Sequence, residues 1–493
     1  MLGNRIIFTI LGPFVFALML IMGGPDSMSP AAYAVLAATL WIAIWWITEA
    51  VPIPVTSLLP IVLYPLCGVM TIEQAAEPYS RPIIYLFVGG FLIALAMERW
   101  NLHKRIALSI IAMVGTNMRR VLLGFMLATW FLSMWISNTA TTVMMLPIAI
   151  SMITQFKTFN DRQDEALPGA EQFGKAVILA LAFSSSIGGI ATLVGTPTNL
   201  IFAESVRDFY NVEIPFDQWF VAGLPLAVIL LVVLYWHLTR NHFHFSQVDV
   251  KGSREMIEGE LRSLGRMSKE EKLVLAIFSL VAVAWITRRY LITPFFPEVN
   301  DINIVLVGAV SLFLIPAPSD RKERLMDWKT ALKLPWGVLL LFGGAFAVAA
   351  GFEISGLTSW IGDKLSLLKG VPFWLVLLVV VTVVNYLTEI TQNMATCTLM
   401  MPIMAALSHV LDVHPFGLMA GTCIAASCAF MLPVATAPNA VVFGSNLITI
   451  KDMVRAGFLM NIISIIVITI FMYFVLPVLW GIDLQAFPDT FAK

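Results

Sequence analysis

The chain has 493 residues, of which 59% are hydrophobic and 12% are charged, and its formal net charge is −1. Ordinary soluble domains carry about 25% charged residues, so this composition excludes a typical soluble globular protein. Many apolar blocks reach the length of about 20 residues that a helix needs to cross a hydrocarbon core. The composition therefore predicts an all-α polytopic membrane protein.

Eleven apolar segments are predicted to cross the membrane as single spans. In chain order they are 6–23, 31–49, 53–70, 82–98, 176–203, 219–239, 273–290, 302–316, 335–352, 417–450 and 456–480. Arg5 and the apolar run behind it resemble a signal peptide, but further spans follow throughout, so a first membrane helix is the better interpretation.

Lys and Arg residues set the orientation of these spans. The segments 99–120 and 320–333 carry five basic side chains each, and 240–272 carries seven, so all three are predicted to be cytoplasmic. The segment 203–218 has four acidic side chains against one arginine and should lie outside. The N-terminus is thus expected in the cytoplasm and the C-terminus outside.

Two further apolar blocks, 121–156 and 371–408, are each too long for one crossing and are split by a polar island. With the orientation above, 121–156 must enter and leave by the cytoplasmic face, and 371–408 must do so by the outer face. Both are therefore predicted to be re-entrant hairpins. Two related hairpins from opposite faces indicate inverted repeats, the usual plan of secondary transporters.

The two polar islands are copies of one pattern. The first, 137–142, contains Asn138, and the second, 392–397, contains Asn393, 255 residues later. Ser and Thr in membrane helices often serve only for packing, and an isolated triplet would be interpreted that way. Because the pattern is duplicated, a functional site is the better interpretation.

Two of the spans are interrupted as well. The break in 176–203 falls at 195–199, and the break in 417–450 falls at 435–439; both contain a proline. Proline removes a backbone donor and disfavours helical geometry at the residue before it. In hydrocarbon such breaks persist only when they are buried or line a polar cavity. Each half thus has two breaks, one at its polar island and one in its interrupted span, and these four breaks are expected to meet near mid-membrane.

These segments carry almost no charge, since Glu389 is the one charged residue in 121–156, 176–203, 371–408 and 417–450 together. A site here must use Asn, Thr and Ser side chains, backbone groups and helix ends. Oxygen ligands suit a cation such as sodium, and helix N-termini favour anions. Glu389 is either a carboxylate linked to a proton or cation, or a hydrogen-bonded group at the hairpin end.

At these residues the sequence resembles the divalent anion/sodium symporter family, the dicarboxylate and citrate carriers. The resemblance covers most of the chain. It is carried by 137–139, 392–394, 195–197, 435–439 and the motif at 47–54. The resemblance implies eleven membrane helices and two opposed hairpins, assembled as a homodimer in the cytoplasmic (inner) membrane of a bacterium, with a transport domain that moves as an elevator against a fixed scaffold.

The same resemblance implies where sodium and substrate bind. One sodium ion would be bound by Ser133, Ser137, Asn138 and Gly195. A second would be bound by Thr388, Thr391, Asn393 and Ala435. The dicarboxylate would lie between them, in contact with Asn138, Thr139, Thr196, Asn393, Met394, Thr436 and Ala437.

It also divides the chain into five regions. The scaffold would comprise 1–120 and 273–370, and the transport domain 121–239 and 371–493, with 240–272 as a cytoplasmic connector.

The second island departs from the family pattern. Gln392-Asn393-Met394 stands where the family usually has Ser-Asn-Thr, so a hydroxyl that could donate to a carboxylate is replaced by a thioether. The expected function is a sodium-coupled symporter that imports succinate, malate or fumarate. A sodium-independent dicarboxylate exchanger and a carrier of citrate or sulfate are the alternatives within this fold.

Other classes of function fit less well. An intramembrane enzyme is not expected, because the site segments contain no histidine near the breaks and no HExxH or GxSxG motif. A channel is disfavoured because inverted hairpins suit alternating access. The expected partners are sodium, a small dianion, the lipid bilayer and a second copy of the chain, with no nucleic acid.

Overall fold

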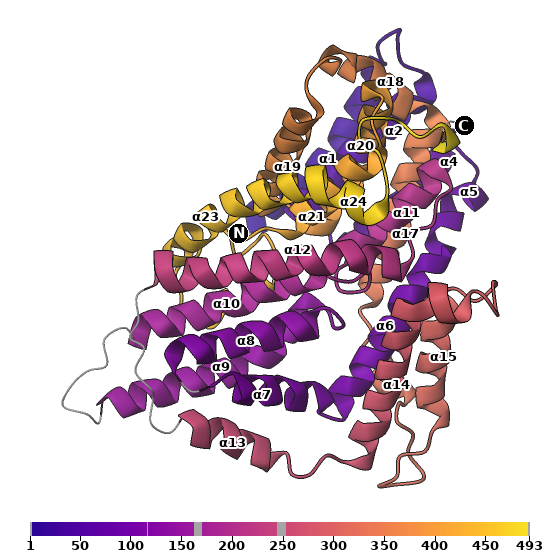
Figure 1. Ribbon diagram of the computed structural model, residues 1–493. Helices are drawn as coiled ribbons and strands as arrows, with labels where there is room; N and C mark the ends of the chain where they lie inside the picture. Colours follow the sequence, from indigo (N-terminus) through magenta and orange to yellow (C-terminus); the bar gives the residue numbers. More distant parts are fainter. Residues whose placement is uncertain (1, 116, 162–169, 244–252, 492–493) are drawn as a thin grey trace.

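The computed structural model describes residues 2–115, 117–161, 170–243 and 253–491, and 78% of these residues are helical (Figure 1). Within these ranges, nine helices are long and apolar enough to cross a membrane, and five apolar helices are shorter. The predicted all-α polytopic membrane fold is thus confirmed. Part of the connector 240–272, residues 244–252, lies outside the described residues.

The helices divide into two series that follow each other along the chain. The first series comprises α1 (Leu2–Met22), α2 (Pro30–Thr48), α3 (Ile53–Thr56), α4 (Leu59–Leu66), α5 (Ile72–Ala76), α6 (Pro82–Arg99), α7 (Leu102–Val114), α8 (Met118–Ser133), α9 (Asn138–Asp161), α10 (Ala170–Ile190), α11 (Pro197–Tyr210) and α12 (Phe216–Trp236). The second comprises α13 (Ser253–Ser263), α14 (Lys269–Thr287), α15 (Asp301–Leu314), α16 (Trp328–Ala331), α17 (Trp336–Ser355), α18 (Leu357–Leu365), α19 (Phe373–Ile390), α20 (Asn393–Leu411), α21 (Pro415–Ser427), α22 (Ala437–Phe443), α23 (Ile450–Ile470) and α24 (Leu476–Trp480).

Three predicted segments differ from the structure. The span 53–70 is two short helices: α3 ends at Thr56, and α4 begins at Leu59 with Pro60 in its first turn, where the missing N–H of proline costs least. The segment 99–120, expected to be a cytoplasmic loop, contains α7, and 353–370, which no predicted span covers, contains α18. Their basic and polar residues concealed an apolar face that is buried against the core.

The duplication extends to these two unexpected helices. α7 follows Asn101 and α18 follows Gly356, and both residues have positive φ angles, 56° and 78°. Glycine and asparagine tolerate this left-handed conformation best. The two residues are 255 positions apart, the same spacing as Asn138 and Asn393. Each half therefore places a helix of the same kind between its long span and its hairpin.

Both polar islands separate the two arms of a helical hairpin. Residues 134–137 divide α8 from α9, and residues 391–392 divide α19 from α20. α9 begins at Asn138 and α20 begins at Asn393. The two hairpin tips were therefore predicted at the correct residues.

The two interrupted spans break earlier than predicted. The breaks cover 191–196 and 428–436, rather than 195–199 and 435–439. Pro197 and Pro438 lie in the first turn of the helices that follow the breaks. Proline is favoured there because the first helical N–H groups have no intrahelical acceptor. The prolines thus start α11 and α22, and the irregular backbone precedes them.

The helices pack around two hydrophobic clusters. The smaller one unites α2 and α4 with α17 and α18, and the larger one runs through most of the other helices. Near one end of the molecule, α14 and α15 lie beside α6, whereas α8 and α10 lie side by side with α12 (Figure 1).

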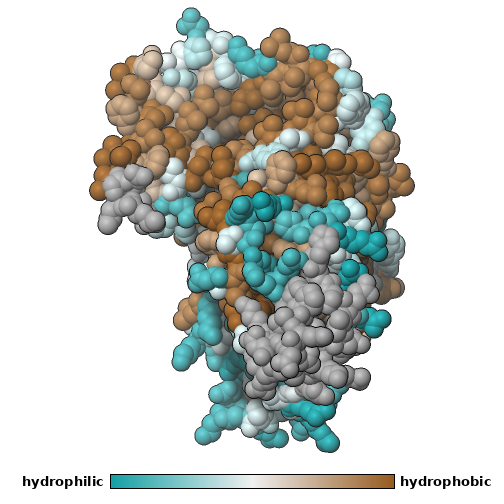
Figure 2. Space-filling model, turned by 90° about the vertical axis from the view of Figure 1, so that its left-hand side faces the viewer, coloured by the Kyte–Doolittle hydropathy of each residue, from teal (hydrophilic) through white to brown (hydrophobic). Residues whose placement is uncertain are grey.

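Apolar side chains cover much of the outer surface. Figure 2 shows them over the upper part of one face, with hydrophilic residues gathered below. Val232 on α12, Val307 on α15 and Val383 on α19 are all more than half exposed. Contiguous apolar surface of this kind is stable only against lipid or protein, which fits a protein that crosses a membrane.

Candidate functional site

The first hairpin tip is held by Asn138, the first residue of α9. One end of its side-chain amide lies 2.7 Å from the hydroxyl of Ser133, 3.1 Å from the carbonyl of Ser185 and 3.3 Å from the carbonyl of Gly195. With the amide nitrogen at that end, the two N–H groups of Asn138 face these three oxygens. The structure therefore brings together three of the four residues predicted for the first sodium site.

The close approach of Asn138 depends on glycine in α10. A Cβ atom at Gly189 would lie 2.5 Å from the Asn138 side chain, and one at Gly195 would lie 2.6 Å from the carbonyl of Gly189. Real Cβ atoms essentially never approach this closely. Ser185 and Gly189 were not predicted from the sequence, although the run Ser184-Ser185-Ser186 before the glycine pair is an unusual polar stretch in an apolar helix.

The second hairpin tip repeats this geometry. The Thr388 hydroxyl donates to the Asn393 side chain at 2.9 Å and to the carbonyl of Ala426 at 3.1 Å. Thr388 is completely buried, as Ser133 is. Because Ser133 donates in the same way to the carbonyl of Ser185 on the helix beside it, at 2.8 Å, the two tips are built on one plan.

Each irregular break is held by an asparagine that follows it. The Asn199 amide donates to the carbonyls of Gly189 at 3.0 Å and Thr192 at 2.7 Å. The Asn439 amide donates to the carbonyls of Ala429 at 3.2 Å and Leu432 at 3.0 Å. In both halves the acceptors lie ten and seven residues before the asparagine. These bonds satisfy carbonyls that the broken helix exposes.

The breaks of the two halves meet inside the protein. The hydroxyls of Thr198 on α11 and Ser427 on α21 are 2.8 Å apart, and both are buried. Cys423 on α21 donates to the Asn199 side chain at 3.3 Å, and Cys397 on α20 donates to the carbonyl of Thr198 at 3.7 Å. Both cysteines are buried, and they lie where the halves join.

Glu389 is buried near the end of α19 and is fully engaged. Its carboxylate accepts backbone N–H bonds from Phe430 at 2.8 Å, Met431 at 2.9 Å and Leu432 at 3.0 Å. It also accepts a bond of 2.6 Å from the side-chain amide of Asn461 on α23. Of the two interpretations left open by the sequence, the hydrogen-bonded one describes these contacts.

The other predicted residues make local contacts. Ser137 accepts a bond from the N–H of Ala140, and Thr436 accepts one from the N–H of Asn439. The Thr391 and Thr396 hydroxyls bond each other, and Thr198 donates weakly to Thr196 at 3.5 Å. Of the remaining predicted residues, Thr139 and Met394 are half-buried, whereas Ala437 is exposed.

Ala435 is buried, and its N–H bonds the carbonyl of Leu432 at 3.2 Å. Met394 packs against both hydrophobic clusters.

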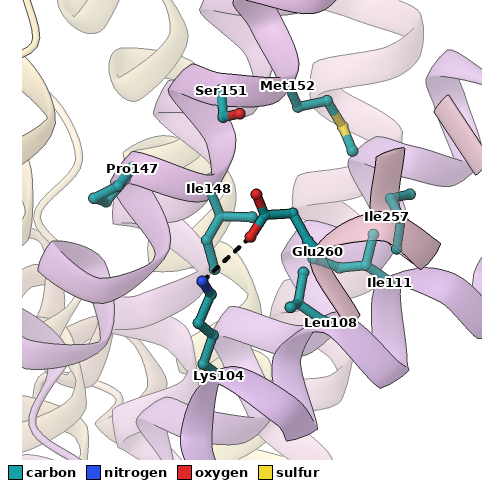
Figure 3. A pocket seen from close by; sticks show the side chains of 9 residues that line it. All are labelled: Lys104, Leu108, Ile111, Pro147, Ile148, Ser151, Met152, Ile257 and Glu260. Carbon is teal, nitrogen blue, oxygen red and sulfur yellow. Dashed lines mark hydrogen bonds and ion pairs between the residues drawn. The ribbon is translucent and has the colours of Figure 1, made fainter. Parts of the chain in front are cut away.

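A cavity of about 190 Å³ lies elsewhere, between α7, α9 and α13 (Figure 3). Its lining is mostly apolar, and Lys104 and Glu260 form an ion pair of 3.2 Å beside it. Its nearest residue on α9 to the tip is Pro147, nine residues from Asn138 and so about 13 Å along the helix. This cavity therefore does not belong to the hairpin tips.

The chemistry of the tips is that of neutral oxygen and nitrogen groups. Among the described residues, no group of three His, Cys, Asp or Glu side chains is placed to hold a metal ion. The tips instead offer hydroxyl, amide and carbonyl oxygens beside the N-termini of α9, α11 and α20. Such groups suit a weakly bound hard cation and an anion rather than a catalytic metal or a nucleophile.

A family model described as the sodium:sulfate symporter transmembrane region matches residues 4–482. A sodium-dependent dicarboxylate transporter of Staphylococcus saprophyticus, SdcS, is 44% identical over 485 residues, which cover 97% of this chain and 93% of that one. The transporter of the same name from Staphylococcus aureus is 44% identical over 486 residues, with 98% and 93% covered.

Two solved structures share the fold. The Neisseria gonorrhoeae protein MtrF, titled as one of a class of antimetabolite efflux pumps, superposes with a TM-score of 0.57 at 12% identity, covering 84% of this chain and 85% of that one. The Alcanivorax borkumensis transporter YdaH superposes with a TM-score of 0.51 at 13% identity, covering 84% and 88%.

Proposed function

The chain belongs to the sodium:sulfate symporter family and is a transporter rather than an enzyme, and on this basis we propose that it imports a four-carbon dicarboxylate together with sodium. The relatives that are 44% identical over nearly their whole length carry the name of sodium-dependent dicarboxylate transporters. The observation that supports the proposal most strongly is the duplicated, uncharged tip. Asn138 and Asn393 each hydrogen-bond a buried hydroxyl, of Ser133 and Thr388, and that hydroxyl also donates to a backbone carbonyl.

Sodium is proposed to bind at each tip. The first ion would be bound by Ser133, Ser137, Asn138 and Gly195. The second would be bound by Thr388, Thr391, Asn393 and Ala435. Sodium prefers oxygen ligands, and broken helices supply carbonyl oxygens that no helix partner uses. The Gly195 carbonyl lies within hydrogen-bonding distance of Asn138, which supports the first set.

The dicarboxylate is proposed to bind between the two ions, because its charge needs compensation that the tips themselves lack. Its contacts would come from Asn138, Thr139, Thr196, Asn393, Met394, Thr436 and Ala437. The positive ends of α9, α11 and α20 would add to the neutralisation supplied by sodium. Sodium would couple to the anion because each binds better once the other is in place.

Transport is proposed to follow an elevator mechanism in a homodimer. The scaffold would comprise 1–120 and 273–370, and the moving domain 121–239 and 371–493, with the hairpins entering from opposite faces of the bacterial inner membrane. The mutual contacts of α11 with α20 and α21 support one rigid moving unit, since the two halves join there through buried hydrogen bonds.

The proposal is tested with purified protein in proteoliposomes. Uptake of labelled succinate is measured with an inward sodium gradient and with potassium replacing sodium. We expect uptake in sodium to exceed uptake in potassium by at least about tenfold, because without cations the anion would face an uncharged, desolvated site. Equal uptake in both conditions would contradict the proposal, and protein-free vesicles give the background.

A competition panel then identifies the substrate. Unlabelled malate, fumarate, citrate and sulfate compete with labelled succinate in sodium. We expect malate and fumarate to compete most strongly. Stronger competition by citrate or sulfate would instead assign the carrier to one of those anions. Uptake that requires internal substrate and ignores sodium would indicate an exchanger.

A further inference from the structure

Glu389 is the one charged residue in the four apolar segments that form the tips and breaks, and the proposed function gives it no part. All four of its contacts come from N–H donors, three of them from the consecutive backbone amides of Phe430, Met431 and Leu432. Consecutive amides that converge on one point form a nest for an anion. The donor set therefore suits an ionised carboxylate, for which four hydrogen bonds offset the cost of burial.

The segment that Glu389 holds is the break of the second half, 428–436. The same segment supplies the carbonyls of Ala429 and Leu432 that Asn439 binds, and it includes Ala435. Glu389 also directly follows Thr388, whose hydroxyl bonds Asn393 at the second tip. One carboxylate thus connects the end of α19, the irregular break and α23 through Asn461.

The first half achieves the same connection without charge. By the spacing of 255 between Asn138 and Asn393, the residue equivalent to Glu389 is Met134. By the spacing of 240 between Asn199 and Asn439, the residue equivalent to Leu432 is Thr192. The Thr192 hydroxyl donates to the backbone carbonyl of Met134. A neutral hydroxyl–carbonyl bond in the first half therefore corresponds to a carboxylate–amide nest in the second. The pseudosymmetry of the two tips is broken by one negative charge.

We propose that Glu389 is a positioning residue that supplies the fixed negative charge of the second cation site and shapes its loop. This inference rests on the proposed sodium-coupled function. The carboxylate is occupied by amides, so it acts on the cation through the loop and through its field rather than as a ligand. Because the first half has no counterpart to this charge, its removal should weaken one cation site and leave the other nearly intact.

The experiment compares Glu389→Gln with the wild-type protein in proteoliposomes. The variant keeps the size of the side chain but removes the charge and turns an NH₂ group towards N–H donors. We expect the sodium concentration for half-maximal succinate uptake to rise at least about tenfold, with a smaller change in the maximal rate at saturating sodium. Protection of purified protein by sodium against thermal unfolding should shift to higher sodium concentration in parallel.

Two further variants keep the test decisive. Asn461→Ala removes one hydrogen bond and retains the charge, so we expect a smaller shift in the same direction, and this variant serves if Glu389→Gln does not fold. Thr192→Val removes the neutral bond of the first half and should shift the sodium requirement less than Glu389→Gln does. Asp412→Asn, an exposed acid at the far end of α20, is the control and should behave as wild type.

The outcomes separate the two proposals. If wild-type uptake does not depend on sodium, the proposed function fails. If wild-type uptake depends on sodium but Glu389→Gln lowers only the maximal rate, the proposed role of Glu389 is overturned. A shift for Thr192→Val as large as that for Glu389→Gln would also overturn it, since loop order rather than charge would then set the affinity.

Discussion

The side-chain amide of Gln392 donates a hydrogen bond of 2.7 Å to the carboxylate of Glu49. Gln392 lies at the tip of the second hairpin, and Glu49 follows α2 in a left-handed conformation with a φ angle of 47°. Gln392 belongs to the departure from the family pattern at 392–394, and Glu49 belongs to the motif at 47–54. The structure thus explains the departure: glutamine is long enough to tie the tip to α2.

This pair should show energetic coupling in transport. Gln392→Ser, Glu49→Gln and the double variant are compared by the KM for succinate uptake in saturating sodium. Each single change already removes the charged hydrogen bond, so the KM of the double variant should match that of the more affected single variant. We expect a coupling free energy of about 1 kcal/mol between the two positions, because the pair is partly exposed. Effects that simply add would show that the two residues act independently.

The asparagines at the two tips should both be essential for transport. Asn138→Ala and Asn393→Ala are each expected to lose at least about nine-tenths of sodium-driven succinate uptake, because each removes an amide whose partners include a buried hydroxyl. Membrane abundance and detergent elution profiles should remain normal. The control is Asn211→Gly at an exposed position with a φ angle of 54°, which glycine adopts freely. Near-normal uptake by either tip variant would show that this asparagine does not belong to the transport site.

The space beside Asn138 should tolerate no added methyl group. Gly189→Ala would bring a Cβ atom to 2.5 Å from the Asn138 side chain, so we expect it to reduce uptake about as much as Asn138→Ala. At Gly90 in α6 the nearest atom to an added Cβ is 3.6 Å away, on Val194. Gly90→Ala is therefore the matched control and should retain uptake. Equal behaviour of the two variants would contradict the close packing at the first tip.

The asparagines that hold the breaks should contribute to stability. Asn199→Ala and Asn439→Ala each remove two hydrogen bonds from a buried amide to carbonyls at the break, at a cost of about 1–3 kcal/mol in the free energy of unfolding. Thermal unfolding in detergent should show a lower midpoint for both. The control is Asn446→Gly, at an exposed position with a φ angle of 58°, and it should leave the unfolding midpoint unchanged. An unchanged midpoint for Asn199→Ala would show that other contacts hold the first break.

Met394 should influence which anion is carried. Met394→Thr restores the hydroxyl donor that the family usually has at this position, and it removes an apolar side chain that packs against both hydrophobic clusters. We expect the relative uptake rates of succinate, citrate and sulfate to change, while sodium dependence is retained. Unchanged relative rates would remove Met394 from the substrate site.

Several features of the fold were visible in the sequence because polar residues are costly in a bilayer. The islands at Asn138 and Asn393 stand out against apolar surroundings, and their spacing of 255 residues revealed the duplication. The prolines marked the interrupted helices but misplaced the breaks, since proline starts a helix as readily as it ends one. Helix α7 was missed because its lysine and arginine residues favoured a loop.

The sequence alone therefore determined the membrane class, the duplication and the two hairpin tips, because each depends on local polarity and on its repetition along the chain. The tertiary structure decided the partners. It placed Glu389 against amides 41 to 43 residues away and against Asn461, 72 residues away, and it joined Thr198 to Ser427 across the two halves. Such contacts depend on how irregular backbone is satisfied once helices pack, and no local pattern encodes that.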